Sequence, residues 1–320
     1  MSADIRLCRG CDAAEMAGLF DSLTKTDDFL YLPLSEDEIK SKFLDDSDGI
    51  SKKAVGMFDR GALSGFAAGC EKGGKRYVTM LAVKANRRGE GIGGALLSRL
   101  ESELGPGPYE ASFYDPIQLS WAVTGTDGQA MHNNSPGVDM ASDAYGFFGS
   151  RGYTPWAVEY SYYLPLTGYD TPDGIKALAG RLAGEGITAG YYDPASHHGF
   201  DHVCDSTGFT GWKDAVRAEL KKPDPRPVLC LFDGDRVIGS TGYISAPPGG
   251  RGFFLGVGVA PEYRGRGCGK LMFSFLCSEL KRMGAGYMTL FTGEENMSAR
   301  RIYEAAGFTH VRSWALMRKA

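Results

Sequence analysis

A glycine-rich segment that occurs twice constrains the fold of this chain more than any other feature of its sequence. Leu81–Gly94 reads LAVKANRRGEGIGG and Val257–Lys270 reads VGVAPEYRGRGCGK, at an offset of 176 residues (257 minus 81). Each copy passes from an apolar run into a segment with apolar side chains at helical spacing. A later matching pair, Ala144–Tyr153 and Ala299–Phe308, lies at an offset of 155 residues (299 minus 144). The first copy therefore carries additional residues around Trp121–Asp139, which we expect to form a long loop.

The repeat indicates two domains of one fold. A chain of 320 residues exceeds what one hydrophobic core usually organises. Pro165, Gly168 and Pro172 interrupt the pattern between the copies, so we expect the boundary in the segment Leu166–Asp173. The predicted domains are residues 1–166 and 167–320.

Short apolar runs separated by turn residues predict strands in each copy, with helices between them, so the expected class is α+β. In the first copy these strands are Ala54–Phe58, Leu63–Cys70, Arg76–Val83, Glu110–Phe113 and Val158–Leu164. In the second copy they are Val228–Phe232, Val237–Ile244, Gly252–Val259, Tyr287–Phe291 and Ser313–Arg318, preceded by a helix at Trp212–Leu220.

Composition argues against several classes of protein. The 35 basic and 39 acidic residues give a net charge of -4, and no stripe of Lys and Arg is dense enough to follow a row of phosphates, so we expect no nucleic-acid partner. Seven cysteines spread over the chain are typical of reduced thiols. The polar segment Met1–Gly10 does not resemble a signal peptide, and no run of 18 apolar residues occurs. We expect a cytoplasmic protein without a membrane partner; its oligomeric state is not encoded in a recognisable motif.

The glycine-rich turn itself predicts a phosphate site, because it leaves backbone N–H groups open at the positive end of a helix. The first copy satisfies the dinucleotide fingerprint Gly89-x-Gly91-x-x-Gly94, but Lys270 replaces the third glycine in the second copy. A P-loop also fails, since Leu271 stands where Ser or Thr is needed. Nicotinamide and nucleoside triphosphates are therefore weak candidates.

The two turns carry a family resemblance. Arg88–Gly93 and Arg264–Gly269 resemble the Arg/Gln-x-x-Gly-x-Gly/Ala motif of the GCN5-related N-acetyltransferase (GNAT) superfamily. Asn296–Phe308 resembles the later helix of that family, with its Asn, Ala, Tyr and Gly-Phe positions. The resemblance implies two tandem GNAT-like domains, each a mixed, mainly antiparallel sheet flanked by helices. It also implies acetyl-CoA as co-substrate, a small-molecule amine or a peptide as acceptor, and no metal.

In this family the diphosphate of acetyl-CoA lies on the glycine-rich turn, and the pantetheine arm pairs with the preceding strand. For the second copy the implied cofactor-binding residues are Val257, Gly258, Val259, Arg264, Gly265, Arg266, Gly267, Cys268, Gly269, Lys270 and Asn296. For the first copy they are Leu81, Ala82, Val83, Arg88, Gly89, Glu90, Gly91, Ile92, Gly93 and Gly94.

The resemblance further implies that the second domain is catalytic. Tyr303 would donate a proton to the departing thiolate; the alternative is a half-buried tyrosine that packs on the sheet. Asn296 would contact CoA or cap a helix, and the two roles are compatible. In the first copy Phe148 and Ala141 stand at the corresponding positions, and Phe148 has no proton to donate, so that domain is expected to be degenerate.

Other features leave alternatives open. The general base is not evident; Glu294, Glu295 and an ordered water chain are candidates. The segment 197–205, rich in His and Asp, is consistent with a metal site, an acceptor-binding loop or a solvated loop. The Cys8–Cys11 spacing has no second pair and is attributed to chance. Cys268 opens a helix, which is expected to lower its thiol pKa, although the family transfers its acyl group directly.

The predicted function is transfer of an acetyl group from acetyl-CoA to a primary amine by direct attack. One alternative is a non-catalytic acyl-CoA-binding or regulatory module, suggested by the degenerate first copy. Another is an acyltransferase that uses a protein N-terminus or a longer acyl group, for which the depth of the pocket near Phe253, Phe254 and Phe291 would matter.

Overall fold

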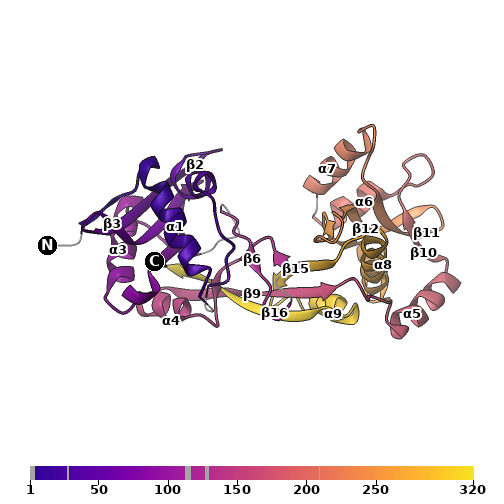
Figure 1. Cartoon of the computed structure of the whole chain (residues 1–320). Coiled ribbons are helices and arrows are strands. Elements are labelled where there is room, and N and C mark those ends of the chain that lie inside the picture. Colours follow the sequence, from indigo (N-terminus) through magenta and orange to yellow (C-terminus); the bar gives the residue numbers. More distant parts are fainter. Residues whose placement is uncertain (1–3, 27–28, 112–116, 127–129, 209) are drawn as a thin grey trace. The chain divides into compact units, whose positions relative to one another are not determined.

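The computed structural model describes residues 4–26, 29–111, 117–126, 130–208 and 210–320. The chain forms two compact units, drawn in Figure 1 with colours that follow the sequence. The first unit comprises Met1–Tyr160 and Arg312–Ala320, and the second comprises Ser161–Val311. The predicted division at residue 166 assigned each copy one continuous segment, whereas residues 312–320 lie in the first unit.

The elements from residue 4 to residue 165 are helices (α), strands (β) and short 3-10 or π-helical turns (η). They are β1 Asp4–Leu7, η1 Gly10–Asp12, α1 Ala13–Leu23, α2 Glu36–Ile39, η2 Lys40–Leu44, β2 Ile50–Asp59, β3 Ala62–Lys72, β4 Lys75–Val83, η3 Ala85–Arg87, α3 Ile92–Leu104, β5 Tyr109–Ala111, β6 Trp121–Ala122, β7 Met131–His132, β8 Val138–Asp139, α4 Asp143–Ser150 and β9 Thr154–Pro165.

The remaining elements follow the same plan after an additional helix, α5. They are α5 Asp173–Gly184, β10 Ile187–Tyr191, α6 Phe200–Ser206, α7 Thr210–Leu220, β11 Val228–Asp233, β12 Arg236–Ser245, β13 Phe253–Phe254, β14 Gly258–Val259, η4 Pro261–Tyr263, α8 Cys268–Arg282, β15 Tyr287–Gly293, α9 Met297–Ala305 and β16 Thr309–Lys319.

The first unit is a sheet with helices on both faces. Its strands lie in the order β1–β2–β3–β4–β5–β16, antiparallel except for the parallel pair β4–β5. Alternate side chains of β2 and β3 enter different cores: Phe58 and Phe66 pack with α1, while Val55 and Ala67 pack with α3. This period of two explains why these strands were predictable from the sequence.

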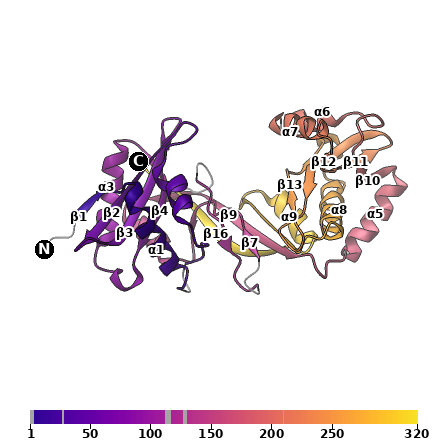
Figure 2. The same ribbon diagram turned by 45° about the horizontal axis from the view of Figure 1, so that its top comes forward.

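The second unit is built around β10–β11–β12, an antiparallel series. Both β13 and β14 pair with β12, while β15 lies beside β9 in the sheet order. Apolar side chains of α6 and α8 bury the central strands, and α5 packs beside α8 (Figure 2). The expected α+β class, with mixed, mainly antiparallel sheets flanked by helices, is confirmed.

One strand prediction needs correction, and another is tested only in part. The predicted continuous strand Gly252–Val259 is interrupted at residues 255–257, between β13 and β14. The predicted strand Glu110–Phe113 is seen as β5, and its residues 112 and 113 lie outside the described part of the chain.

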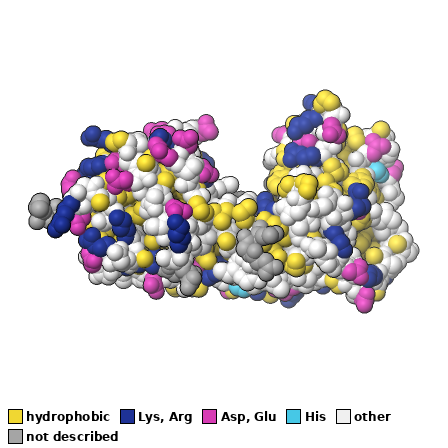
Figure 3. All heavy atoms as spheres, in the orientation of Figure 1, with side chains coloured by type: hydrophobic (Ala, Val, Ile, Leu, Met, Phe, Trp, Pro, Cys, Tyr) yellow, Lys and Arg dark blue, Asp and Glu magenta, His cyan; other side chains and the backbone are white. Residues whose placement is uncertain are grey.

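Charge is mixed over the surface. On the face drawn in Figure 3, Lys and Arg side chains lie among Asp and Glu side chains on each unit. Within the described residues, no helix combines the length and the apolar character needed to cross a membrane.

Candidate functional site

A cleft of about 860 Å³ in the second unit brings together the predicted residues of the second copy. Its wall is formed by β14, the glycine-rich turn, the start of α8, the end of β15 and α9. The predicted residues on this wall are Val257, Gly258, Val259, Arg264, Gly265, Arg266, Gly267, Cys268, Gly269, Lys270, Asn296 and Tyr303. The packing of α9 against α8 brings the glycine-rich motif and the later helix motif together.

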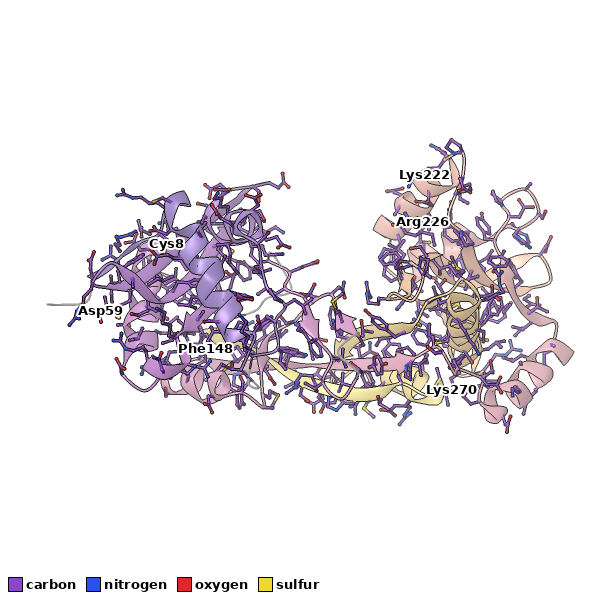
Figure 4. The ribbon with its side chains drawn as sticks, viewed as in Figure 1. Cys8, Asp59, Phe148, Lys222, Arg226 and Lys270 are labelled. Carbon is purple, nitrogen blue, oxygen red and sulfur yellow. The ribbon has the colours of Figure 1, made fainter. Side chains whose placement is uncertain are left out.

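The turn has the backbone geometry that an anion site requires. Gly265 and Gly267 have φ values of 77° and 95°, a region that is costly for residues with a Cβ. Gly267 is the residue before α8, whose first turn leaves N–H groups without helical partners. Lys270 lies in that first turn (Figure 4). Open N–H groups and a nearby cation together favour a phosphate.

The arginines of the turn are already engaged by protein groups. Arg264 Nε donates a hydrogen bond to Val259 O at 3.1 Å, which ties the turn to the end of β14. Arg266 Nη2 lies 2.6 Å from Glu185 Oε2, and this hydrogen bond raises the pKa of the guanidinium. The turn is therefore braced before any ligand arrives.

Tyr303 lies on α9 with its ring in an aromatic cluster. Its ring centroid is 4.9 Å from that of Phe273, 5.7 Å from Tyr162 and 6.1 Å from Phe308. The side chain is half-buried and lines the cleft. Packing on neighbouring side chains and exposure to the cleft thus occur together, and the aromatic cluster restricts the directions in which the phenol can point.

Asn296 caps α9, as one of its two predicted roles required. Its Oδ1 accepts a hydrogen bond from Ala299 N at 3.1 Å, and its Nδ2 donates to Thr292 Oγ1 at 3.1 Å. The cap fixes the start of the helix that carries Tyr303.

The interruption between β13 and β14 lies at the other end of the cleft. Leu255 N and Gly256 N donate to Tyr243 O and Thr241 O, at 3.2 and 3.1 Å. The indole of Trp212, from α7, lies directly on Gly256, in the space where a Cβ would stand. This end is formed mainly by apolar side chains: Trp212, Phe254, Leu290 and Phe291.

Several lining residues were missed from the sequence. Leu178 from α5, Thr207 and Trp212 from the α6–α7 region, and Arg301 from α9 all line the cleft. The helical periodicity of α7 was a signal for Trp212, but no local pattern marks the strand against which a helix will pack. Among the described lining residues none is Asp, Glu or His, so neither Glu294 nor Glu295 reaches the wall.

The first unit has a corresponding cleft of about 480 Å³. Its wall includes Leu81, Ala82, Val83, Arg88, Gly89, Gly91, Ile92, Gly93 and Gly94. Gly89 and Gly91 both have φ values of 82°, which match Gly265 and Gly267. Glu90, also predicted here, is not on this wall; its carboxylate accepts a hydrogen bond from Arg87 Nε at 2.7 Å.

Two differences separate the clefts. Phe148, labelled in Figure 4, lines the first cleft. By the offset of the later motif it corresponds to Tyr303, which lines the second cleft. The guanidinium of Arg151 lies against Gly94, since a Cβ added there would be 2.9 Å from Arg151 Cζ. In the second copy the equivalent residues are Lys270 and Ala306, so the cation is supplied from a different position of the fold.

Two further expectations are wrong. The segment 197–205 is not a simple loop, because Phe200–Ser206 forms α6 and buries Phe200, Val203 and Cys204. Cys268 is not an activated thiol: it is 1% exposed, and burial raises its pKa despite the nearby Arg266. Within the described part of the chain, no three His, Cys, Asp or Glu side chains are grouped to hold a metal ion.

Known proteins resemble this chain over most of its length. Residues 191–308 match the sequence model of a family described as the acetyltransferase (GNAT) family. A mycothiol acetyltransferase of Geodermatophilus obscurus is 25% identical over 256 residues, which cover 78% of this chain and 76% of that relative.

Two solved structures share the fold across 99% of this chain. One contains a GCN5-related glucosamine N-acetyltransferase region within a fungal multi-domain GH3 β-N-acetylglucosaminidase, with a TM-score of 0.66 and 20% identity; this chain spans 38% of that longer chain. The other is a tandem GNAT protein from the clavulanic acid biosynthesis pathway, with a TM-score of 0.59, 13% identity and 98% of that chain covered.

The fold and the two glycine-rich clefts define a tandem acyltransferase of the GNAT type. The family match in the second unit and the curated relative agree with this class. Residues 191–308 thus carry a domain of the acetyltransferase (GNAT) family, and the chain is an acetyltransferase.

Proposed function

We propose that the protein transfers the acetyl group of acetyl-CoA to a primary amine of a small molecule, and that the reaction takes place in the cleft of the second unit. The observation that carries the proposal is that the turn Arg264–Lys270, Asn296 and Tyr303 line one cleft. The relatives named for mycothiol and glucosamine acetylation support a small-molecule amine as acceptor.

Different residues of the cleft bind different parts of acetyl-CoA. The backbone N–H groups of the turn bind the diphosphate, and residues 257–259 pair with the pantetheine arm. This arrangement directs the thioester toward the apolar end near Phe254 and Trp212. Holding the thioester and the amine in one cleft removes the entropic cost of their encounter during the reaction.

The transfer is a direct attack. The neutral amine nitrogen attacks the thioester carbonyl, a C–N bond forms, and the C–S bond breaks as the tetrahedral intermediate collapses. The CoA thiolate takes a proton from the Tyr303 hydroxyl, which leaves a tyrosinate. The former amine nitrogen releases one proton to solvent, and the tyrosinate takes one proton from solvent, which restores the phenol. A primary amine with an ordinary pKa of about 10 is mostly protonated at neutral pH, so an acceptor of lower pKa reacts more readily.

We propose a different role for the first unit, which binds CoA through residues 88–94 without transferring its acyl group. Phe148 has no proton to donate at the position of Tyr303. In this proposal the first copy is an acyl-CoA-binding or regulatory module, and the second copy is the enzyme.

Release of free thiol from acetyl-CoA, measured with a panel of amino sugars, amino thiols, arylalkylamines and peptides, tests the proposal. Tyr303→Phe is expected to lower kcat by about 100-fold or more, since general acid catalysis typically contributes that much. Phe148→Tyr, introduced into the Tyr303→Phe protein as a matched exchange, should not restore the rate. Unchanged turnover by Tyr303→Phe would rule out its role as the proton donor.

A further inference from the structure

Helix α5 reaches the glycine-rich turn of the second unit from outside the cleft's main wall. It precedes β10 and packs beside α8, as Figure 2 shows. Three of its contacts end on the turn, through Leu178, Arg181 and Glu185, the last being its C-cap residue. None of the three belongs to the glycine-rich motif.

The first contact is apolar. A Cβ added to Gly267 would lie 2.8 Å from Leu178 Cδ1, so the leucine covers the αL glycine that starts α8. Leu178 also lines the cleft. The turn therefore cannot widen on this side without displacing α5.

The second contact fixes one peptide plane. Arg181 Nη2 donates a hydrogen bond to Arg266 O at 2.8 Å. Because the carbonyl and the following N–H of a trans peptide point in opposite directions, this bond directs the Gly267 N–H away from α5. Because Gly267 has no Cβ and a positive φ, this peptide could otherwise rotate at a lower cost than one before another residue.

The third contact balances charge. Glu185 lies 2.6 Å from Arg181 Nη1 and 2.6 Å from Arg266 Nη2. These two hydrogen bonds lower the pKa of the Glu185 carboxyl, which keeps it ionised. Glu185 thus holds both guanidinium groups beside the turn.

The first unit braces its turn differently. There Arg87 binds Glu90 of the turn itself at 2.7 Å and Asp59 at 3.4 Å. The second copy has Tyr263 in place of Arg87, and its hydroxyl donates to Asp233 at 2.6 Å. Bracing by α5 is therefore particular to the second unit among the described contacts.

We propose that Arg181 is a positioning residue for the diphosphate of CoA, which acts by holding the Arg266–Gly267 peptide in the orientation that presents its N–H to the phosphate. This inference rests on the proposed function, since it assumes that CoA binds to the second turn. It assigns α5, outside the family motif, a part in donor recognition.

The experiment compares two acetyl donors on the full chain. Acetyl-CoA carries the diphosphate, whereas S-acetylpantetheine has the same thioester without it. With one acceptor amine, Arg181→Met should lower kcat/KM for acetyl-CoA by about five- to ten-fold, the effect of losing one charge-assisted hydrogen bond at a partly exposed site. For S-acetylpantetheine the change should stay below about two-fold on the same scale.

Lys176→Met is the matched control, because Lys176 lies on the same helix and pairs with Asp170 at 2.7 Å, away from the turn. Arg181→Lys keeps a donor and should recover part of the loss, which also guards against misfolding of the methionine variant. Equal losses with both donors, or no loss with acetyl-CoA, would overturn the inference. Absence of both CoA binding and thiol release in the unmodified protein would instead contradict the proposed function.

Discussion

The two glycine-rich turns share one backbone geometry and differ in the side chains that brace them and face them. Gly91 and Gly267 both precede a helix in the αL region, with φ of 82° and 95°. Yet one turn is braced by its own Arg87–Glu90 pair and faces Phe148, while the other is braced by α5 and faces Tyr303. A shared turn geometry therefore does not bring the same side chain from the later helix: Tyr303 lines the second cleft, whereas Phe148, which has no hydroxyl group, lines the first.

Placing a carboxylate at the same position of each turn is expected to give the largest difference in turnover between the two copies. Gly269→Glu should lower turnover by about 100-fold or more, because a negative charge beside a diphosphate costs several kcal/mol. Gly93→Glu should remove CoA from the first cleft with a far smaller effect on turnover. Thiol-release kinetics and calorimetric stoichiometry give the two readouts. A larger loss of turnover from Gly93→Glu would assign catalysis to the first unit.

The bracing of the two turns is compared by adding one methyl group to each. Gly91→Ala should cost about 1–2 kcal/mol of unfolding free energy, the strain of an alanine at positive φ, because no other atom lies within 4 Å of the new Cβ. Gly267→Ala should cost roughly 1–3 kcal/mol more, since its Cβ meets Leu178. Urea unfolding followed for each unit measures both. Equal losses of unfolding free energy would mean that Leu178 and α5 move to accommodate the new methyl group at little cost.

The cation exchange between the copies gives a smaller effect. Arg151→Ala, measured with Gly269→Glu present so that only the first cleft binds, should weaken CoA binding by about three- to ten-fold. Lys270→Ala with Gly93→Glu should do the same in the second cleft. Adding Gly94→Lys to Arg151→Ala transplants the second arrangement and should recover affinity. Failure of this recovery would show that the two cations are not equivalent.

The smallest effect concerns a titration in the final strands, where β9 carries Glu159 and β16 carries Trp314 at the equivalent position. Burial raises the pKa of Glu159 to about 7. The folded state therefore binds this proton more tightly than the unfolded chain, and stability falls as pH rises from about 4.5 to about 7. Glu159→Gln should raise the melting temperature by a few degrees at pH 8 and leave it unchanged near pH 4.5. A gain at low pH instead would contradict this sign.

The sequence predicted those features that are encoded locally. The period of two gave β2, β3 and β4, and the glycine spacing gave both turns with their helices. Asn296 as a cap followed from the residue type alone. Placing Tyr303 near the turn was possible only through the family resemblance, because the two motifs meet by tertiary packing.

What could not be predicted depends on partners far away in the sequence. Nothing in the segment around Arg181 indicates that its side chain meets Arg266, which lies in a turn reached only after the sheet has formed. Cys268 shows the same limitation: its position at a helix start suggested activation, but its burial by other elements reverses the direction of the pKa change. Local sequence specifies conformation, whereas the environment of a side chain is a property of the assembled unit.

The distribution of β16 between the units has a consequence for biosynthesis. Met317 pairs with Ala111 of β5, and Trp314 pairs with Asp139 of β8, both within the first unit. During translation, the first copy emerges from the ribosome long before β16, the strand that completes its sheet. Until β16 is made, β5 has an unpaired edge that is prone to non-native pairing. Expression of the first copy alone, ending near residue 160, should therefore yield aggregated protein, and folding of the intact chain should be limited by this long-range closure.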